Sequence, residues 1–274
     1  MTVSIIIPAC NESAYIDACL GALAASQGLD GAQVVVAANG CTDDTVARAR
    51  DWAPRFTAMG WALDVLDLPG VGKPGALDAG DTAAIHADRA YLDADVIVSP
   101  LLLGQVARAL SGDSARYVSG TPVVTAKGFW SRAYARFWVK LPFVAQGVPG
   151  FGLYAVNAAG RGRWGNFPRI ISDDTFVRIQ FTAAERHKVP ATYDWPIVEG
   201  VARLVKVRRR QDQGVAELAE LHPNLMDNEE KARPTKPWLI GQLLRDPVAF
   251  GTYAVVTVLV KAGWGAQSGW VRGR

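Results

Sequence analysis

The chain has 274 residues, of which half are hydrophobic and one fifth charged, a composition typical of a folded protein with a sizeable core. This length allows one large α/β domain or two small ones. The three cysteines (Cys10, Cys19 and Cys41) show no C-x-x-C spacing, which favours a reduced, cytoplasmic setting over a disulfide-stabilised secreted domain. The apolar run at residues 5–7 is too short for a signal peptide and is interrupted by Pro8.

The net charge of +3 is distributed unevenly along the chain. Residues 1–113 hold 14 acids and 6 bases, whereas eight Lys or Arg residues and no acid lie between Asp113 and Asp173. From Asp173 onwards there are 15 bases and 12 acids. The acidic first part suggests a bound metal, and the basic middle suggests an anionic partner such as phosphate, anionic lipid or nucleic acid.

Predicted strands and helices alternate along the first hundred residues. Residues 3–8 are a β-branched run ended by proline, which predicts a buried strand, and Asn11 or Ser13 can cap the helix that follows. The next predicted elements are a strand at 33–37, a turn and capped helix start at 38–45, a strand at 61–66, a loop at 70–75 and a helix from 76 to about 86. This alternation indicates βαβ units and a parallel sheet.

Two carboxylates, Asp93 and Asp95, end the short apolar run at residues 91–96. If the run is a strand, side chains at i and i+2 share a face, so the two carboxylates converge. Converging carboxylates repel unless a cation lies between them, and Mg²⁺ and Mn²⁺ prefer such oxygen ligands. The alternative is a solvated loop with both aspartates on a polar surface.

Four polar segments fall at the carboxyl ends of the predicted strands, where the ligand crevice of a parallel sheet lies. They are residues 8–12, residues 39–42, Lys73 and the Asp93/Asp95 pair. Their common position favours one binding site over four unrelated surface features.

The segments 4–12, 40–45, 72–77 and 92–95 resemble, in order and spacing, the motifs of family 2 nucleotide-sugar glycosyltransferases. The resemblance covers roughly residues 2–212. It implies an α/β protein of the GT-A type, a three-layer sandwich with a mostly parallel twisted sheet. We therefore expect a GT-A domain at 1–214, with a nucleotide-binding half at 1–113 and an acceptor half at 114–214, followed by a helical C-terminal extension at 215–274.

The resemblance also implies roles for individual residues. Asp95 is expected to be the main ligand of a divalent cation (Mg²⁺ or Mn²⁺) on the donor diphosphate, with Asp93 supporting it nearer the ribose. The donor-binding positions implied are Pro8, Ala9, Glu12, Asn39, Lys73, Asp93, Arg208 and Arg210. The expected partner is thus a nucleotide-sugar and not a nucleic acid.

One departure from the family pattern concerns the nucleotide base. The family often has two aspartates before the glycine of the second motif, and one of them contacts the base. Here these positions are Ala38 and Asn39. Asn39 can bond a base through its amide, but a UDP donor does not follow from the sequence.

A second acidic pair, Asp173 and Asp174, follows an apolar dipeptide. Ser172 or Asp173 can cap the helix expected there, which is the simpler interpretation. The family has an acidic pair at a helix start here, and its second member deprotonates the acceptor hydroxyl. The resemblance therefore makes Asp174 the general base and Asp173 its neighbour, since a helix N-terminus keeps a carboxylate ionised.

Between the two acidic pairs, the glycine-rich stretch 146–154 predicts a sharp turn or a close approach of the backbone. It resembles the family segment that lines the sugar and acceptor pocket. Arg161, Arg163 and Trp164 follow in an expected flexible loop, where Trp164 either stacks on a sugar or packs on the surface.

Residues 204–214 contain three consecutive arginines. As a strand, this run would place Arg208 and Arg210 on one face, where their guanidinium groups suit a phosphate. A solvated basic edge is the alternative. His222 is left unassigned, because a lone histidine is more often structural than a metal ligand.

Two segments raise the question of a membrane surface. The aromatic and basic run at 127–140 is either an amphipathic helix packed on the sheet or a helix lying at a membrane. The fourteen uncharged residues at 247–260 are fewer than the roughly 20 needed to span a bilayer, so they predict a buried or interfacial helix. Four residues of the tail resemble a membrane-surface anchor, namely Trp264, Trp270, Arg272 and Arg274. A cytoplasmic protein at the inner face of the membrane, with a lipid-linked or anionic acceptor, is one expectation.

The sequence thus predicts metal-dependent, inverting transfer of a sugar from a nucleotide-sugar to an acceptor hydroxyl. A nucleotidyltransferase would usually have a glycine- and arginine-rich loop after the first strand, which residues 8–12 lack. A non-catalytic nucleotide-sugar or membrane-binding protein is the other alternative, disfavoured by the intact Asp93, Asp95 and Asp174. A Rossmann dehydrogenase is disfavoured because no G-x-G-x-x-G follows the first strand.

Overall fold

A computed structural model describes residues 1–229 and 232–265 of the chain. The chain divides into two compact units. We call residues 1–123 with 150–195 the sheet unit, and residues 124–149 with 196–274 the helical unit. Of the proposed tail anchor, Trp270, Arg272 and Arg274 lie outside the described residues.

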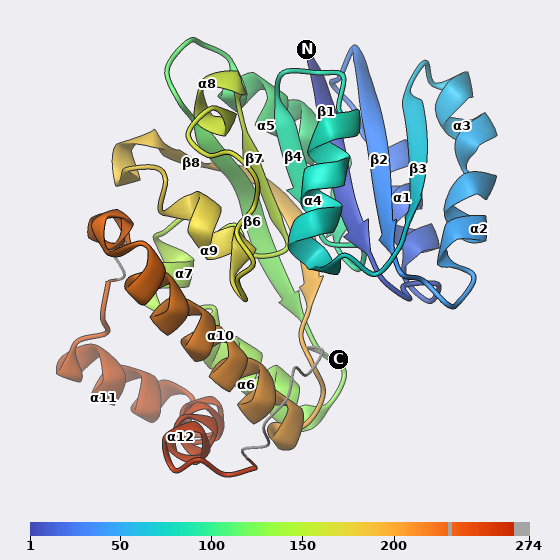
Figure 1. Ribbon diagram of the computed structural model, residues 1–274. Coiled ribbons are helices and arrows are strands. Elements are labelled where there is room, and N and C mark those ends of the chain that lie inside the picture. The colour runs from blue at the N-terminus through green and yellow to red at the C-terminus, as the bar shows by residue number, and fades with distance from the viewer. Residues whose placement is uncertain (230–231, 266–274) are drawn as a thin grey trace. The chain divides into compact units, whose positions relative to one another are not determined.

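Within the described residues, the strands form one eight-stranded sheet in the order β3-β2-β1-β4-β7-β6-β8-β5 (Figure 1). The strands are β1 (Thr2–Ala9), β2 (Gly31–Asn39), β3 (Ala62–Leu68), β4 (Arg89–Leu92), β5 (Ile97–Val98), β6 (Tyr117–Thr125), β7 (Leu153–Val156) and β8 (Arg186–Pro196). From β3 to β4 all neighbours are parallel, whereas β7 is antiparallel to β4 and to β6, and β5 is antiparallel to β8. The predicted α/β fold is confirmed, and the sheet is mixed because its second half returns in antiparallel strands.

Helices cover both faces of β1, which explains its continuous apolar sequence. Ile5 and Ile7 belong to the same buried cluster as Leu20 of helix α1 (Ile16–Ala24). Ile6 points to the opposite face, where α4 (Gly72–Ala83) lies (Figure 1). A Cβ built on Gly80 of α4 would come within 2.4 Å of the Ile6 side chain, so α4 packs directly on β1. Helix, sheet and helix thus form the three expected layers.

The remaining helices of the sheet unit are short. They are α2 (Thr45–Asp51), α3 (Ala53–Ala58), α5 (Leu102–Leu110), α8 (Ala158–Arg161), α9 (Asp173–Arg178) and the 3₁₀ helix η1 (Ala183–Glu185).

Two helix starts differ from the prediction. Helix α1 begins after Tyr15 without a side-chain cap, so Asn11 and Ser13 do not cap it. Helix α4 begins at Gly72 instead of residue 76, and Gly72 itself has a φ of +79°, which glycine tolerates because it has no Cβ.

The helical unit contains α6 (Phe129–Trp138), α7 (Pro142–Ala145), α10 (Val201–Leu221), η2 (Pro223–Asn228), α11 (Lys236–Arg245) and α12 (Pro247–Lys261). Its core joins α6, α10 and α12 through Tyr134, Leu204, Val205 and Val256. The predicted helices at 127–140 and 247–260 are therefore present, and they pack against each other. In the described part of the chain, no helix has both the length and the apolar content needed to cross a bilayer.

Candidate active site

The parallel strands β1, β2 and β4 end at one edge of the sheet. In the register of these strands, Ala9 is paired with Ala38 and Ile6 with Tyr91. The three strands therefore end at similar positions along the sheet. Three of the predicted donor-side residues, Pro8, Ala9 and Asn39, are at the ends of β1 and β2. Glu12 and Asp93 lie in the segments that follow β1 and β4. The parallel arrangement thus brings together segments that are widely spaced in the sequence.

The turn after β2 is held to its neighbours by short hydrogen bonds. The Asn11 side chain accepts the backbone N–H of Thr42 at 2.7 Å, and Asn11 itself has a φ of 54°, which asparagine tolerates better than most residues. The backbone N–H of Glu12 donates to Oγ1 of Thr45 at 2.7 Å. These contacts fix the position of the segment that was predicted to approach the nucleotide.

Asn39 is oriented by a contact to the loop before α4. Its Oδ1 atom accepts the backbone N–H of Val71 at 2.7 Å. A backbone N–H can only donate, so this bond identifies the amide oxygen and leaves the amide NH₂ group, a donor, free to face a ligand. An aspartate here would offer an acceptor instead.

Lys73, in the first turn of α4, connects the two acidic pairs. Its Nζ atom lies 3.1 Å from Oδ1 of Asp93 and 3.2 Å from Oδ1 of Asp173. Partial burial opposes its charge, but the carboxylates of Asp173, Asp93 and Asp174 together raise the pKa of Lys73 above its ordinary value. Lys73 therefore remains a cation at neutral pH and screens carboxylates that would otherwise repel one another.

Asp93 and Asp95 do not lie on a strand, so the predicted i, i+2 convergence on one face is wrong. Strand β4 ends at Leu92, and a turn follows in which the Val96 N–H donates to the Asp93 carbonyl at 3.1 Å. Asp93 remains partly exposed beside Lys73, whereas Asp95 is only 6% exposed. The alternative of a solvated loop is equally wrong for Asp95.

The backbone of Asp93 is held by the glycine-rich segment. Its N–H donates to the carbonyl of Gly152 at 2.9 Å. Gly152 has a φ of +76°, and a Cβ on it would lie 2.6 Å from the Trp195 ring and 2.9 Å from Val96. The predicted close approach of the chain at 146–154 is therefore present, and it positions the turn that carries Asp93.

Acidic side chains of the site are the candidate ligands for a divalent cation. Among residues 1–229 and 232–265, no group of three or more His, Cys, Asp or Glu side chains could hold a metal by itself. Mg²⁺ typically uses one or two carboxylates and takes its other ligands from substrate phosphates and water. Asp93 and Asp95 have oxygen ligands of the type such a cation prefers, and a cation held by them would need further ligands from a diphosphate. Metal binding by these two residues stays a prediction.

Asp173 and Asp174 open helix α9, and they differ in environment. Asp173 is buried, which raises the pKa of its carboxyl; Lys73 opposes this rise, and the charges of Asp174 and Asp93 add to it. Asp174 is half-buried, and its Oδ1 atom accepts the N–H of Thr175 at 2.7 Å. The capping interpretation is not supported, because Ser172 makes no side-chain cap and Asp173 is engaged with Lys73.

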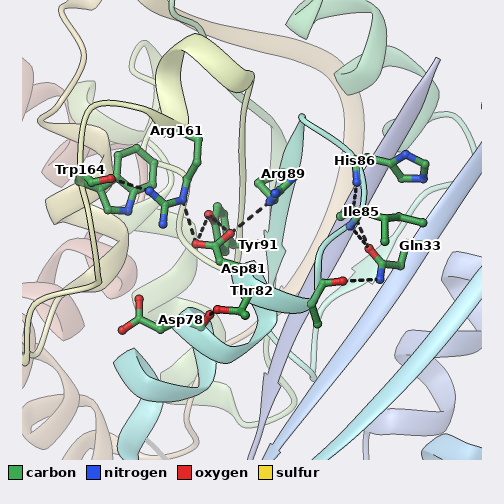
Figure 2. Close-up of polar contacts among 12 residues, drawn as sticks. Gln33, Asp78, Asp81, Thr82, Ile85, His86, Arg89, Tyr91, Arg161 and Trp164 are labelled. Atoms are coloured by element: carbon green, nitrogen blue, oxygen red, sulfur yellow. Dashed lines mark hydrogen bonds and ion pairs between the residues drawn. The ribbon is translucent and has the colours of Figure 1, made fainter.

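A second polar network, which the sequence did not reveal, lies farther along α4 (Figure 2). The buried Asp81 carboxylate accepts the Tyr91 hydroxyl at 2.9 and 3.0 Å and pairs with Arg161 Nε at 2.9 Å and Arg89 Nε at 3.3 Å. Burial raises the pKa of Asp81, while Arg161 and Tyr91 act in the opposite direction. This carboxylate therefore joins α4, β4 and α8.

Arg161 also fixes the segment after α8, which was expected to be a flexible loop. Its guanidinium donates to the carbonyls of Trp164 and Gly165 at 2.6 and 3.0 Å and stacks on the Trp164 ring at 4.6 Å (Figure 2). The Phe167 N–H donates to Asp78 of α4 at 2.8 Å. With the Lys73–Asp173 pair, three polar contacts attach residues 161–173 along α4, so this segment is not loose.

Arg208 and Arg210 belong to α10 of the helical unit, so the strand considered for residues 204–214 is wrong. Helical rotation turns the two side chains about 200° apart, which places them on opposite sides. Arg208 pairs with Asp212 at 3.0 Å and donates to the Tyr253 hydroxyl at 3.2 Å. His222 follows the last turn of α10. Phosphate binding by Arg208 and Arg210 stays a prediction.

Comparison with known proteins places these features in a family. The family model "Glycosyl transferase family 2" matches residues 4–162. No curated protein matches the sequence. The match includes the sheet edge, the Lys73–Asp93 pair and Arg161, and it ends before Asp173 and Asp174.

Solved structures of glycosyltransferases share the fold. A mannosyltransferase from Pyrobaculum calidifontis, in complex with GDP-Man and Mn²⁺, is 21% identical and has a TM-score of 0.62, over 97% of this chain and 76% of that one. TarS from S. aureus, in complex with UDP, is 14% identical, with a TM-score of 0.56 over 100% and 95% of the two chains. Glucosyl-3-phosphoglycerate synthase from Mycobacterium tuberculosis, in complex with Mn²⁺, UDP and glucosyl-3-phosphoglycerate, is 18% identical, with a TM-score of 0.54 over 80% and 79%. The matched motifs and the shared GT-A fold lead to one conclusion: this chain belongs to glycosyltransferase family 2 and is a glycosyltransferase.

Proposed function

We propose that this glycosyltransferase transfers a sugar from a nucleotide-sugar to an acceptor hydroxyl with inversion at the anomeric carbon, and that Asp174 is the general base. The observation that supports this most is Lys73, which contacts both Asp93 after β4 and Asp173 at α9. It ties the expected donor side to the expected acceptor side within the sheet unit. We retain the assignment of residues 1–113 to the donor and 114–214 to the acceptor.

In the proposed reaction, the acceptor oxygen forms a bond to the anomeric carbon while the bond from that carbon to the diphosphate oxygen breaks. The hydroxyl proton moves to the carboxylate of Asp174, and the electron pair of the broken bond leaves with the diphosphate. One displacement from the face opposite the leaving group inverts the configuration. Asp173, held by Lys73, acts as a positioning residue for the acidic pair.

Asp95, supported by Asp93, would hold Mg²⁺ or Mn²⁺ together with the donor diphosphate. When bound, such an ion neutralises charge that develops on the departing nucleoside diphosphate. The mannosyltransferase and the phosphoglycerate synthase described above contain Mn²⁺, which supports a divalent cation here.

In this proposal, the turn after β2 recognises the nucleotide base of the donor. Pro8, Ala9 and Glu12 also contribute to donor binding. Asn39 presents an NH₂ donor, because its oxygen is taken by Val71. It therefore suits an acceptor atom on the base, whereas an aspartate would suit an N–H group. Structural neighbours bind guanine and uracil nucleotides, so the fold accommodates either.

The acceptor is proposed to be anionic or lipid-linked, because residues 114–172 carry eight bases and no acid. Arg208 and Arg210 would contribute to this basic character or to binding of the diphosphate. Glucosyl-3-phosphoglycerate synthase, which has also been solved in complex with phosphoglyceric acid, gives an anionic precedent within the fold.

A thermal-shift screen with nucleoside diphosphates and their sugars tests the donor side. Ligands that bind the native state raise the melting temperature by mass action, so one nucleotide family should stabilise the protein when Mn²⁺ is present. Asp95→Asn should remove the increment due to Mn²⁺, measured against the melting temperature of the same variant without ligand. Absence of a shift with every nucleotide, with and without Mn²⁺, would contradict the proposed function.

A further inference from the structure

Helix α12 of the helical unit is apolar on more than one side. Between Pro247 and Lys261 the sequence contains no charged residue. One side packs inward, where Val256 joins Tyr134 of α6 and Leu204 of α10 in a buried cluster. A helix that is apolar all round normally buries its whole circumference.

The opposite side of α12 is open. Val248, Val255 and Val258 recur at helical spacing and are exposed, with Val255 at 52% and Val258 at 63%. Gly251 lies on the same stripe, and a Cβ built on it would meet no atom within 4 Å. An uninterrupted apolar stripe therefore runs the length of α12, and no element within residues 1–229 and 232–265 covers it.

Helix α11 extends this apolar surface. Ile240, Leu243 and Leu244 are exposed, and the chain passes from α11 to α12 through the single residue Asp246. Both helices lie side by side in Figure 1. We call the exposed residues of α11 and the outer stripe of α12 the apolar face.

Two exposed aromatic residues of α6 lie near the C-terminal end of α12. The rings of Phe137 and Phe250 are 5.6 Å apart, and those of Tyr134 and Tyr253 are 5.5 Å apart, so α6 and α12 run antiparallel. The first turn of α6, with Phe129 and Trp130 more than half exposed, therefore lies near the last turn of α12. Aromatic side chains of this kind are favoured at the boundary between water and lipid.

The charges around the apolar face are mainly positive. From Ala232 to Gly265 the sequence has four bases and one acid, Asp246. The Asp246 carboxylate pairs with Arg136 at 2.9 Å and accepts the Ala249 N–H at 3.0 Å, so its charge is compensated. The whole helical unit carries 16 bases and 8 acids, a net charge of +8, whereas the sheet unit carries 13 bases and 18 acids, a net charge of −5.

This distribution distinguishes among partners for the apolar face. Pairing with a second copy would bring two units of +8 together, which like-charge repulsion opposes. An anionic bilayer offers both an apolar layer for the valine and leucine side chains and a negative surface for Lys236, Arg245 and Lys261. We infer that the α11–α12 apolar face is a docking surface for an anionic membrane, on which the helical unit lies without spanning it.

Sedimentation of the full chain with lipid vesicles, in the absence of nucleotide, tests this inference independently of the transfer reaction. The probes are vesicles of phosphatidylcholine containing phosphatidylglycerol and vesicles of phosphatidylcholine alone. We expect binding to the anionic vesicles, weakened by high salt because screening shortens the reach of the lysine and arginine charges. Binding to neutral vesicles should be weak.

The decisive variant carries Val255→Asp together with Val258→Asp. It should lower the fraction bound to anionic vesicles by about tenfold or more, because each change puts a charge where acyl chains would lie. Ile85→Asp is the matched control, since Ile85 is 68% exposed but belongs to the sheet unit, and it should bind as the unchanged protein does. A second variant with Lys236→Glu and Lys261→Glu leaves the apolar face intact and should reduce binding to anionic vesicles.

Three results would overturn the inference. These are no binding of the unchanged protein to anionic vesicles, equal binding to neutral and anionic vesicles, and equal loss of binding in Ile85→Asp and the valine double variant. Circular dichroism and the melting temperature of each variant show whether it is folded. If the valine double variant does not fold, the lysine double variant and the lipid dependence of the unchanged protein decide the question. Self-association that disappears in the valine double variant, without vesicle binding, would identify a second copy as the partner.

Discussion

The Nζ atom of Lys73 lies 3.2 Å from Oδ1 of Asp173, although the two residues are far apart in the sequence. The same ammonium group lies 3.1 Å from Oδ1 of Asp93. One side chain in the first turn of α4 thus contacts an aspartate from the end of β4 and an aspartate from the start of α9. Its loss is expected to affect both the position and the ionisation of these acids.

We predict that Lys73→Met lowers the rate of sugar transfer by about 10²-fold, the size of effect seen when a preorganised electrostatic group is removed. The pKa of Asp173, already raised by burial, should rise further without the opposing Lys73 charge. As the pH falls, Asp173 then becomes protonated at a higher pH than in the unchanged enzyme. The acidic limb of the plot of kcat against pH should therefore shift to higher pH. Lys73→Arg keeps the charge and should move this limb less. A pH profile that is identical in Lys73→Met and the unchanged enzyme would contradict the prediction.

Asp174→Asn should abolish most transfer while nucleotide-sugar binding stays nearly intact. General-base catalysis typically contributes 10²- to 10⁴-fold, so we expect kcat to fall by about 10³-fold. The measurements are kcat and the dissociation constant of the donor, the latter by calorimetry. Asp174→Glu, which retains a carboxylate, is the control and should keep more activity than Asp174→Asn. Loss of donor binding in Asp174→Asn would count against its role as the base.

Asp81→Asn should lower the free energy of unfolding by about 3 kcal/mol, since removing one partner of a buried charge network leaves the others uncompensated. Asp81 is 10% exposed on its side chain and faces both Arg89 and Arg161. The matched control is Asp17→Asn, whose partner Arg48 is about half exposed; it should change stability by less than about 1 kcal/mol. Urea unfolding measures both.

A double-mutant cycle tests whether Asp81 and Arg161 act together. The effects of Asp81→Asn and Arg161→Gln should not add, because each change removes the same ion pair. Additive effects would show that the contact at 2.9 Å contributes no coupling.

Stability should depend on the ionisation of Glu185 at acidic pH. Hydrogen bonds from Arg163, with Nη1 at 3.0 Å from Oε2, together with the N–H and hydroxyl of Thr182, lower the pKa of Glu185 to about 2. The pKa in the folded state is thus below that of the unfolded chain, so the stabilisation is complete above pH 4.5 or so and is lost as the pH falls toward 2.

Glu185→Gln should therefore lower stability at pH 7 by about 1–2 kcal/mol, a value discounted for partial exposure of the pair. The difference between the variant and the unchanged protein should shrink as the pH approaches 2. Chemical unfolding at several pH values measures this, and a difference that is constant with pH would contradict the assignment.

The buried parallel strands were the most predictable part of the fold. Residues 5–7 and 34–37 form continuous apolar runs because both faces of β1 and β2 are covered, and that pattern is visible without a structure. The turn after Leu92 was not visible, since an apolar run with two aspartates reads equally well as a strand. The secondary structure of the three arginines at 208–210 was also ambiguous, because a short charged segment has no clear helical or strand periodicity.

The candidate site was predictable where a motif carries it and not where distant side chains meet. Lys73 and Asp173 were each identified, but their contact depends on how α4 and α9 pack. Asp81 gave no signal, because an aspartate in a helix is usually a solvated residue. Its partners Arg161 and Tyr91 come from other elements, and the network exists only once these are assembled.

The contact between Asn39 and Val71 has a consequence for changing the donor. Residues 39–42 and 69–71 are pressed together: a Cβ on Gly40 would lie 3.0 Å from the Cα atom of Gly70, and Asn39 accepts the Val71 N–H. Replacing either loop alone would break this fit. To change the nucleotide preference with loops from another enzyme, residues 39–42 and 69–71 therefore have to be replaced together. The graft should stop before Lys73, so that the helix holding the acidic pairs is left as it is.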